Sequence, residues 1–316
     1  MDDSSCPRIL TIYGPTAVGK TSVAIEIAVR IDGEIVSCDS RQVFKYLDIG
    51  TAKPTTAERE QVRFHLIDVI HPTRLMNAYE FRLLAEKAID DILARGKVPI
   101  MTVGTGFYLK AMTDGIFEAP SADDEFRLRM EEIIESDGTV ALHARLKEID
   151  PEAASAISEN DAVRIIRALE LYYLTGKTRS ELAKETQLSP SPYKFVFMGL
   201  TLDREELYEK IDRRCEQMLD DGLMEEAKSL REKKLLSDEM AEKIVGYNEV
   251  YKHLDGIYSF DETLAKFQQA TRNYAKRQLT WFRKHPGGWI CDVSDNMLTD
   301  KILQEFQDGR FISRGR

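Results

Sequence analysis

Apolar residues gather in short runs along the chain, and each run has the length of a buried strand. A typical example is the segment 98–103 (VPIMTV), which is almost wholly apolar and lies between Lys97 and Gly104. Short apolar runs bounded by polar residues or glycine are typical of strands buried on both faces. We predict strands with this pattern at residues 8–13, 34–38, 64–70, 98–103, 195–201 and 289–293.

Longer segments with apolar residues three to four positions apart separate most of these runs. This spacing is typical of helices that bury one face. We predict such helices at residues 21–30, 79–95, 105–114, 204–219 and 224–233. Strands that alternate with helices form a mostly parallel sheet with helices on both faces, so the pattern predicts an α/β fold.

The alternation stops between Pro120 and the proline-rich segment 189–192. The intervening residues carry only helical patterns, at 123–136, 139–149, 161–175 and 179–184. Prolines at both borders mark the ends of an inserted unit. We therefore predict an all-helical domain at residues 121–190, inserted into an α/β core made of residues 1–120 and 191–316.

Composition agrees with a globular protein of one large core and an elaboration. The chain has 316 residues, of which 43% are hydrophobic and 31% charged. The first residues, MDDSSCPR, are polar, and no apolar run approaches about 18 residues, so we expect no membrane contact and a cytoplasmic protein. The four cysteines form no C-x-x-C pair, which argues against a zinc site or a disulfide framework.

Charge limits where a nucleic acid could bind. The formal net charge is −10, which repels nucleic acid from the molecule as a whole. The segment 268–285 is the exception, because it has basic residues, interleaved aromatic residues and no acid. Its arginines and lysines are Arg272, Lys276, Arg277, Arg283 and Lys284. On a helix, Arg272, Lys276 and Arg283 share one face; a solvated surface helix with its aromatic side chains turned inward is the alternative reading.

The turn after the first predicted strand has the spacing G-x-x-x-x-G-K-[ST]. Its residues are Gly14, Pro15, Thr16, Ala17, Val18, Gly19, Lys20 and Thr21. Between a strand and a helix, consecutive backbone N–H groups of such a turn point at one anion, and the helix N-terminus adds partial positive charge. Lys20 reaches the outer phosphate, and the hydroxyl of Thr21 is placed to bind Mg²⁺. The loop therefore predicts a site for a di- or triphosphate with Mg²⁺.

Two further predicted strands end in polar residues that meet this loop at the carboxyl edge of a parallel sheet. The strand 34–38 ends in Asp39, Ser40, Arg41 and Gln42, and the strand 98–103 ends in Gly104, Thr105 and Gly106. A carboxylate at Asp39 is suited to bind Mg²⁺ through water or to act as a general base. Asp39 and Thr105 also fit simple capping roles. No acidic residue stands at the end of the strand 98–103, where an ATPase usually carries its Mg²⁺-binding aspartate. This disfavours an ATPase.

Several segments together resemble the family of bacterial tRNA dimethylallyltransferases. In chain order they are 14–21 (GPTAVGKT), 37–54 (SCDSRQVFKYLDIGTAKP), 104–109 (GTGFYL), 160–172 (NDAVRIIRALELY), 205–223 (EELYEKIDRRCEQMLDDGL), 244–249 (IVGYNE) and 271–283 (TRNYAKRQLTWFR). They extend over nearly the whole chain. The combination of the D-S-x-Q strand end with D-I-G-T-A-K-P and Y-A-K-R-Q-x-T-W-F is the specific part of the resemblance.

The resemblance implies that the loop holds the diphosphate of dimethylallyl diphosphate rather than a nucleotide. The acceptor would be N6 of the adenosine immediately 3′ of the anticodon, in tRNAs that read codons beginning with U. Lys20, Asp39 and Thr105 would be the catalytic residues, with Asp39 taking the proton of N6. The resemblance also adds Arg214 to the diphosphate site, and it implies Mg²⁺ as the cofactor and a monomer without an obligate protein partner.

By the same resemblance, the helical insertion would grip the anticodon stem-loop. The implied tRNA contacts are Asp39, Ser40, Arg41, Gln42, Thr105, Arg127, Val163, Arg164, Ile165, Ile166, Arg167, Arg272, Lys276, Arg277 and Arg283. Val18 stands where the family commonly has Ser or Ala, which should not affect backbone contacts. Val245 and Asn248 stand where Ile or Leu and a basic residue are usual, which leaves the role of 244–248 in RNA contact open. The alternatives are an isopentenyltransferase that acts on free AMP or ADP and an ATP-binding P-loop kinase of small molecules.

Overall fold

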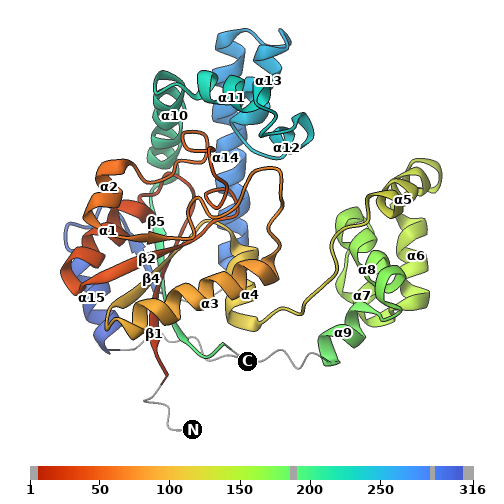
Figure 1. Ribbon diagram of the computed structural model, residues 1–316, viewed down its shortest axis with the longest axis horizontal. Helices are drawn as coiled ribbons and strands as arrows, with labels where there is room; N and C mark the ends of the chain where they lie inside the picture. Colours follow the sequence, from red (N-terminus) through yellow and green to blue (C-terminus); the bar gives the residue numbers. More distant parts are fainter. Residues whose placement is uncertain (1–5, 186–190, 285–288, 309–316) are drawn as a thin grey trace. The chain divides into compact units, whose positions relative to one another are not determined.

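The computed structural model describes residues 6–185, 191–284 and 289–308, which fall into two compact units. The core unit consists of Met1–Thr113 and Ser191–Arg316, and the helical unit of Asp114–Pro190 (Figure 1). The helical unit begins before the expected border at residue 121. The reason lies in Pro120, whose carbonyl accepts a hydrogen bond of 2.7 Å from Arg167 and so belongs to the helical unit.

The core unit is built on a parallel sheet with the strand order β3-β2-β4-β1-β5-β6. The strands are β1 (Arg8–Tyr13), β2 (Gly33–Cys38), β3 (Phe64–His65), β4 (Val98–Val103), β5 (Lys194–Thr201) and β6 (Trp289–Asp292). Tyr13 of β1 and Cys38 of β2 are both in register with Val103 of β4. The loops that follow these three strands therefore start side by side at the carboxyl edge of the sheet.

The predicted strand 64–70 is wrong beyond its first two residues. Leu66 and Asp68 adopt left-handed backbone angles, with φ of 63° and 60°, and an extended strand cannot continue through them. The turn directs the carboxylate of Asp68 to Lys53 and Arg59, with which it forms ion pairs of 2.5 and 2.8 Å. Pairing resumes only at Ile70, as an isolated bridge to Phe44.

Helices pack on both faces of the sheet, so the predicted α/β class is confirmed. The helices of the core unit are α1 (Lys20–Ile31), α2 (Thr56–Gln61), α3 (Ala78–Ala94), α4 (Gly106–Asp114), α10 (Arg204–Asp220), α11 (Leu223–Glu232), α12 (Asp238–Glu242), α13 (Tyr247–Leu254), α14 (Phe260–Lys284) and α15 (Leu298–Asp308). From β1 to β2 the chain passes over β4 toward the β3 edge of the sheet, and from β3 to β4 it passes over β2 in the opposite direction. Since such crossovers are right-handed, α1 and α3 lie on opposite faces.

Helix α14 is longer than the basic segment that predicted it. It begins at Phe260, and its last residue is Lys284, so the final predicted residue, His285, lies outside the described residues. Thr271, Ala275, Gln278 and Phe282 follow one another along its buried stripe. In Figure 1 the helix runs beside α10, with which it is packed. Through this stripe, α14 reaches the carboxyl edge of the sheet.

The helical unit has a small apolar core of its own. It consists of α5 (Asp124–Asp137), α6 (Thr139–Ile149), α7 (Pro151–Ala156), α8 (Ala162–Thr175) and α9 (Arg179–Glu185). Leu142, Leu146 and Ile165 are fully buried at its centre. Helix α7 was not predicted; Asp150 caps it by accepting from the N–H of Ala153, and Pro151 occupies its first turn.

Candidate active site

The phosphate-binding loop runs from the end of β1 to the start of α1. Gly19, with a φ of 108°, is the N-cap of α1, and Ala17 has a φ of 64°. Left-handed residues of this kind turn successive backbone N–H groups toward one point, which is the geometry of an anion-binding nest. Gly14 has no room for a side chain, because a Cβ would lie 2.7 Å from the carbonyl oxygen of Leu200. The loop thus joins the sheet closely and presents its amides at the carboxyl edge.

Lys20 closes this loop with its own side chain. Its Nζ donates hydrogen bonds of 2.9 Å to the carbonyl oxygens of Gly14 and Pro15. Burial lowers the pKa of Lys20 to about 8, while the nearby carboxylate of Asp39 acts in the opposite direction. An anionic ligand beside Lys20 would favour the charged amine.

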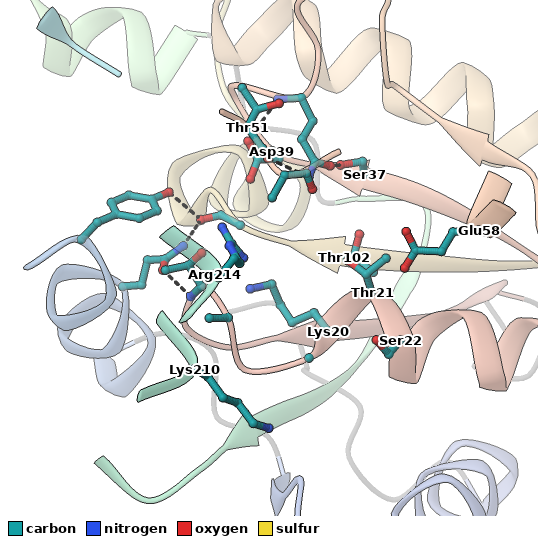
Figure 2. Close-up of a pocket in the computed structure, with 18 residues that line it drawn as sticks. Lys20, Thr21, Ser22, Ser37, Asp39, Thr51, Glu58, Thr102, Lys210 and Arg214 are labelled. Atoms are coloured by element: carbon teal, nitrogen blue, oxygen red, sulfur yellow. Dashed lines mark hydrogen bonds between the residues drawn. The ribbon is translucent and has the colours of Figure 1, made fainter. Parts of the chain in front are cut away.

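Arg214 supplies a second cation from α10. Burial lowers the pKa of Arg214, and the guanidinium makes no hydrogen bond or ion pair with any other residue in the described part of the chain. Figure 2 shows that the side chains of Arg214 and Lys20 point toward the same space. Two converging cations are the expected surroundings of a diphosphate.

Asp39 stands at the end of β2 and uses its two carboxylate oxygens differently. Oδ1 accepts from the backbone N–H groups of Arg41 and Gln42, at 2.8 and 3.3 Å, and so caps the turn that follows the strand. Oδ2 lies against Gly104 at the end of β4, where a Cβ would be only 2.1 Å from it. The cap therefore uses only one oxygen of Asp39, and the turn leaves the second oxygen unused.

Thr105 ties the ends of β2 and β4 together. Its hydroxyl oxygen accepts a hydrogen bond of 2.9 Å from the N–H of Ser40 and donates one of 3.1 Å to the Ser40 hydroxyl. Its own N–H is bonded to the carbonyl of Cys38. The hydroxyl thus serves Ser40 and not the first turn of α4, contrary to the capping alternative for Thr105.

The structure adds Gln278, to which the sequence pattern assigned no role. Its side-chain Oε1 accepts from the N–H of Thr16 at 2.8 Å, and its Nε2 donates to the carbonyl of Gly104 at 2.8 Å. Thr16 and Gln278 are 262 positions apart in sequence. The signals available beforehand were its place in the motif Y-A-K-R-Q-x-T-W-F and its polar side chain among apolar neighbours.

Two cavities meet at these residues. The first, of about 440 Å³, is lined by Lys20, Thr21 and other residues of the phosphate-binding loop. The second, of about 430 Å³, is more apolar and is lined by Met218, Phe267 and Trp281 among others. The residues that line both are Thr16, Asp39, Thr51, Gly104, Arg214, Tyr274 and Gln278. Asp39 therefore stands where a polar cavity adjoins a more apolar one.

The motif D-I-G-T-A-K-P forms a structural wall of this site. Lys53 is buried, and its amine donates to the carbonyl of Phe44 and pairs with Asp48 and Asp68. This lysine is therefore occupied by its own loop and is not a ligand-binding residue.

The same wall is held from outside by Glu226 of α11, which the sequence did not single out. Its carboxylate accepts from the backbone N–H groups of Asp48, Ile49 and Gly50, at 2.9 to 3.2 Å, and from the hydroxyl of Tyr247 at 2.5 Å. Gln42 fastens the adjacent stretch by donating to the carbonyls of Thr51 and Ala52. The wall is thus fixed by contacts distant in sequence.

The cations predicted to contact RNA differ in their availability. On α14, Arg272 forms an ion pair with Asp212, and Lys276 lies over the ring of Tyr208 at 5.9 Å. Arg277 lines the second cavity, as do Arg41 and Lys243. Arg283 is exposed.

In the helical unit, the side chains of two of the expected RNA contacts are buried. Ile165 and Ile166 are 0% and 8% exposed, because they face the apolar core of the unit. Val163 and Arg164 remain exposed on the same helix. The side chains of Arg127 and Arg167 both pair with the buried carboxylate of Glu170, which gives them a structural role.

Metal binding by protein groups alone is not a feature of this site. Within residues 6–185, 191–284 and 289–308, no three His, Cys, Asp or Glu side chains come close enough to hold an ion. None of the helices in that part of the chain combines the length and apolar character needed to cross a membrane.

The parallel sheet carries a nest of amides at its carboxyl edge, with two convergent cations and a carboxylate beside it. These features define a P-loop α/β protein. The profile of the IPP transferase family matches residues 42–285. The chain is 41% identical to the tRNA dimethylallyltransferase of Geobacter metallireducens, over 90% of this chain and 92% of that one. It is 43% identical to that of Acetivibrio thermocellus, over 95% and 96%. The chain belongs to the IPP transferase family.

Solved structures agree with this assignment. A tRNA isopentenylpyrophosphate transferase from Bacillus halodurans is 37% identical, with a TM-score of 0.67 over 95% of each chain. A eukaryotic dimethylallyltransferase, solved in states of acting on tRNA, is 27% identical, with a TM-score of 0.80 over 98% of this chain and 82% of that one.

Proposed function

We propose that this protein transfers a dimethylallyl group from dimethylallyl diphosphate to N6 of the adenosine immediately 3′ of the anticodon, position 37, in tRNAs that read codons beginning with U. The observation that carries this proposal is the junction of the two cavities at Asp39. One side of the junction is cationic and suits a diphosphate, and the other combines apolar side chains, which suit a prenyl group and a base, with basic ones. Family membership supports the transfer reaction and tRNA as the acceptor.

The donor would bind with its diphosphate in the loop. The N–H groups of residues 17 and 19–21 would face the anion, and Lys20 and Arg214 would add charge from two sides. As the bond between the allylic carbon and the diphosphate oxygen breaks, the leaving diphosphate keeps the electron pair. Fixed amides and cations that stabilise this charge lower the barrier.

Asp39 would then act on the acceptor. The lone pair of the adenine amino group is delocalised into the ring, so N6 attacks well only if its proton is removed as the C–N bond forms. Oδ2 of Asp39 is the oxygen not used by its own turn, and it is suited to take that proton. Thr105 and Ser40 hold the two loops that frame the reaction centre.

Mg²⁺ fits the polar cavity as a cofactor. Mg²⁺ is held in proteins by few protein oxygens together with water and phosphate, and the first cavity offers the hydroxyl of Thr21. When bound, the ion would neutralise charge on the leaving diphosphate. The absence of a larger carboxylate cluster among the described residues is compatible with this mode.

The acceptor base must leave its stack to enter the second cavity, at a cost of a few kcal/mol. Arg41, Arg277 and Lys243 line that cavity, and their positive charge would attract the RNA backbone around the flipped base. Because one chain lines both cavities, we propose that the enzyme acts as a monomer, and, since its substrate is tRNA, in the cytoplasm.

A label-transfer experiment tests the proposal. The protein is incubated with Mg²⁺ and unmodified tRNA, with either dimethylallyl diphosphate labelled in its prenyl carbon or ATP labelled in its γ-phosphate. We expect label in tRNA only from the prenyl donor, located at position 37 by nuclease digestion. Label transferred from ATP would support the kinase alternative, and equal transfer to free AMP would support the free-nucleotide alternative.

A further inference from the structure

The carboxamide of Gln278 bridges two loops that have separate tasks. The side chain is 7% exposed and lines both cavities. One of its arms ends at the phosphate-binding loop, at Thr16, and the other at the end of β4, at Gly104. Each arm is a hydrogen bond of 2.8 Å, so the carboxamide has no freedom to serve one loop without the other.

The arm to Thr16 uses the first N–H that follows Pro15 in the phosphate-binding loop. Pro15 has no N–H, the N–H of Thr16 is directed to Gln278, and the N–H of Val18 is directed to the carbonyl of Pro15, which leaves the amides of residues 17 and 19–21 for an anion. A movement of the loop on binding a diphosphate is therefore transmitted to Gln278.

The arm to Gly104 links Gln278 indirectly to the carboxylate of Asp39, because Gly104 lies against that carboxylate. Oδ2 of Asp39 lies so close to Gly104 that a Cβ there would be 2.1 Å away. A shift in the backbone of Gly104 must therefore shift Asp39 as well. The chain of contacts runs from the loop through Thr16, Gln278 and Gly104 to Asp39.

We infer that Gln278 is a positioning residue that couples occupation of the diphosphate loop to the placement of Asp39 at the acceptor side. The inference rests on the proposed function, since it concerns the same site. A misplacement of about 1 Å at a reaction centre lowers a rate on the order of 10²-fold, so coupling of this kind is sufficient to control turnover.

The test compares Gln278→Met with Gln268→Met. Methionine has nearly the shape of glutamine but makes neither hydrogen bond. Gln268 lies on the same helix and is also hydrogen-bonded, but to Asp212 and Glu216 of α10, outside the two cavities. The probe is inorganic diphosphate with Mg²⁺, and its binding is measured by calorimetry.

Hydrogen exchange then reports the coupling. We expect diphosphate to slow exchange of the amides at residues 17–20 in all three proteins. At Gly104 and Thr105 it should slow exchange in wild type and Gln268→Met but not in Gln278→Met. Unchanged protection at residues 104–105 in Gln278→Met would overturn the inference and leave the proposed function standing. A wild-type protein that binds no diphosphate would overturn both.

Kinetics give a second reading. With both substrates saturating, kcat of Gln278→Met should fall about 10- to 100-fold, with the KM for tRNA changed less than twofold. A role in folding alone would lower the fraction of active protein and leave the kcat of the folded fraction unchanged. If Gln278→Met does not fold, Gln278→Asn keeps the polar group but is one methylene too short to span both loops, and it should show the same loss of coupling.

Discussion

Both carboxylate oxygens of Asp39 have close neighbours. One oxygen holds the turn after β2, and the other is enclosed by Gly104, which has no side chain to compete for the space. Glycine at position 104 is therefore explained by the carboxylate beside it and not by its own backbone angles.

Replacing Asp39 by Asn tests the chemical role apart from the structural one. The Asn side-chain oxygen can still accept from Arg41, so folding and tRNA affinity should be preserved. Without a general base, the single-turnover rate with both substrates saturating should fall about 10²- to 10⁴-fold. Thermal unfolding and tRNA binding serve as controls. A near-native rate would remove Asp39 from the mechanism.

At the scale of elements, sequence periodicity predicted most of what local forces decide. The strands at 8–13 and 98–103 were predicted to the residue, because their apolar runs end at glycine or charged residues. The prediction of a strand at 64–70 was wrong beyond its first two residues, since no local sequence pattern indicates the left-handed backbone at Leu66 and Asp68. The short helix α12 was missed because its pattern is too brief to show a period.

The active site, too, was predictable only where local sequence determines the structure. The phosphate-binding loop is a local motif, and Asp39 and Thr105 follow from where strands end. Gln278 and Glu226 were not given roles, because each acts on a loop more than 170 residues away in the chain. Such contacts depend on how α14 and α11 pack, and the spacing of residues along the chain does not predict this packing.

Helix α14 carries a prediction of its own, about the salt dependence of tRNA binding. Lys276, Arg277 and Arg283 have no carboxylate partner among the described residues, whereas Arg272 is paired with Asp212. Alanine at any of the first three should reduce the slope of log K against log[salt] by roughly 0.7–0.9. Arg272→Ala should reduce it less, since its charge is already balanced.

The measurement is a titration with an anticodon stem-loop at several salt concentrations. Lys266→Ala is the matched control, because it removes the same charge from the half of α14 that begins with Asp261 and Glu262. Its slope should equal that of wild type. Unchanged slopes in all variants would support the alternative that α14 is a solvated surface helix with no role in RNA binding.

At the scale of the whole molecule, stability in acid should depend on a charge cluster at the amino edge of the sheet. Glu34 of β2 is buried, and its carboxylate accepts from Arg95 after α3 and is bonded to His65 of β3. The hydrogen bond from Arg95 is the main reason that the pKa of Glu34 falls to about 2, with His65 adding to it. The cluster thus connects three elements of the core.

Because folding lowers this pKa, the cluster stabilises the protein above the pKa of the unfolded chain, and the stabilisation is lost as pH falls from about 4.5 to about 2. Glu34→Gln should lower the free energy of unfolding at pH 7 by about 2–4 kcal/mol and flatten its dependence on pH in that window. Urea unfolding across pH measures both. Glu26→Gln, which breaks the exposed pair with Arg30, should cost less than about 1 kcal/mol; an equal loss in both variants would contradict the role of burial.

The grip of Glu226 on residues 48–50 has an entropic consequence. Fixing the backbone of one residue costs about 1–2 kcal/mol, so ordering this stretch when a substrate arrives would take roughly 3–6 kcal/mol from the binding free energy. A carboxylate of the chain itself occupies these three amides, and the ordering is completed during folding. The neighbouring Thr51, which lines both cavities, is thereby preorganised, and the free energy of substrate contacts remains available for affinity and for the transition state.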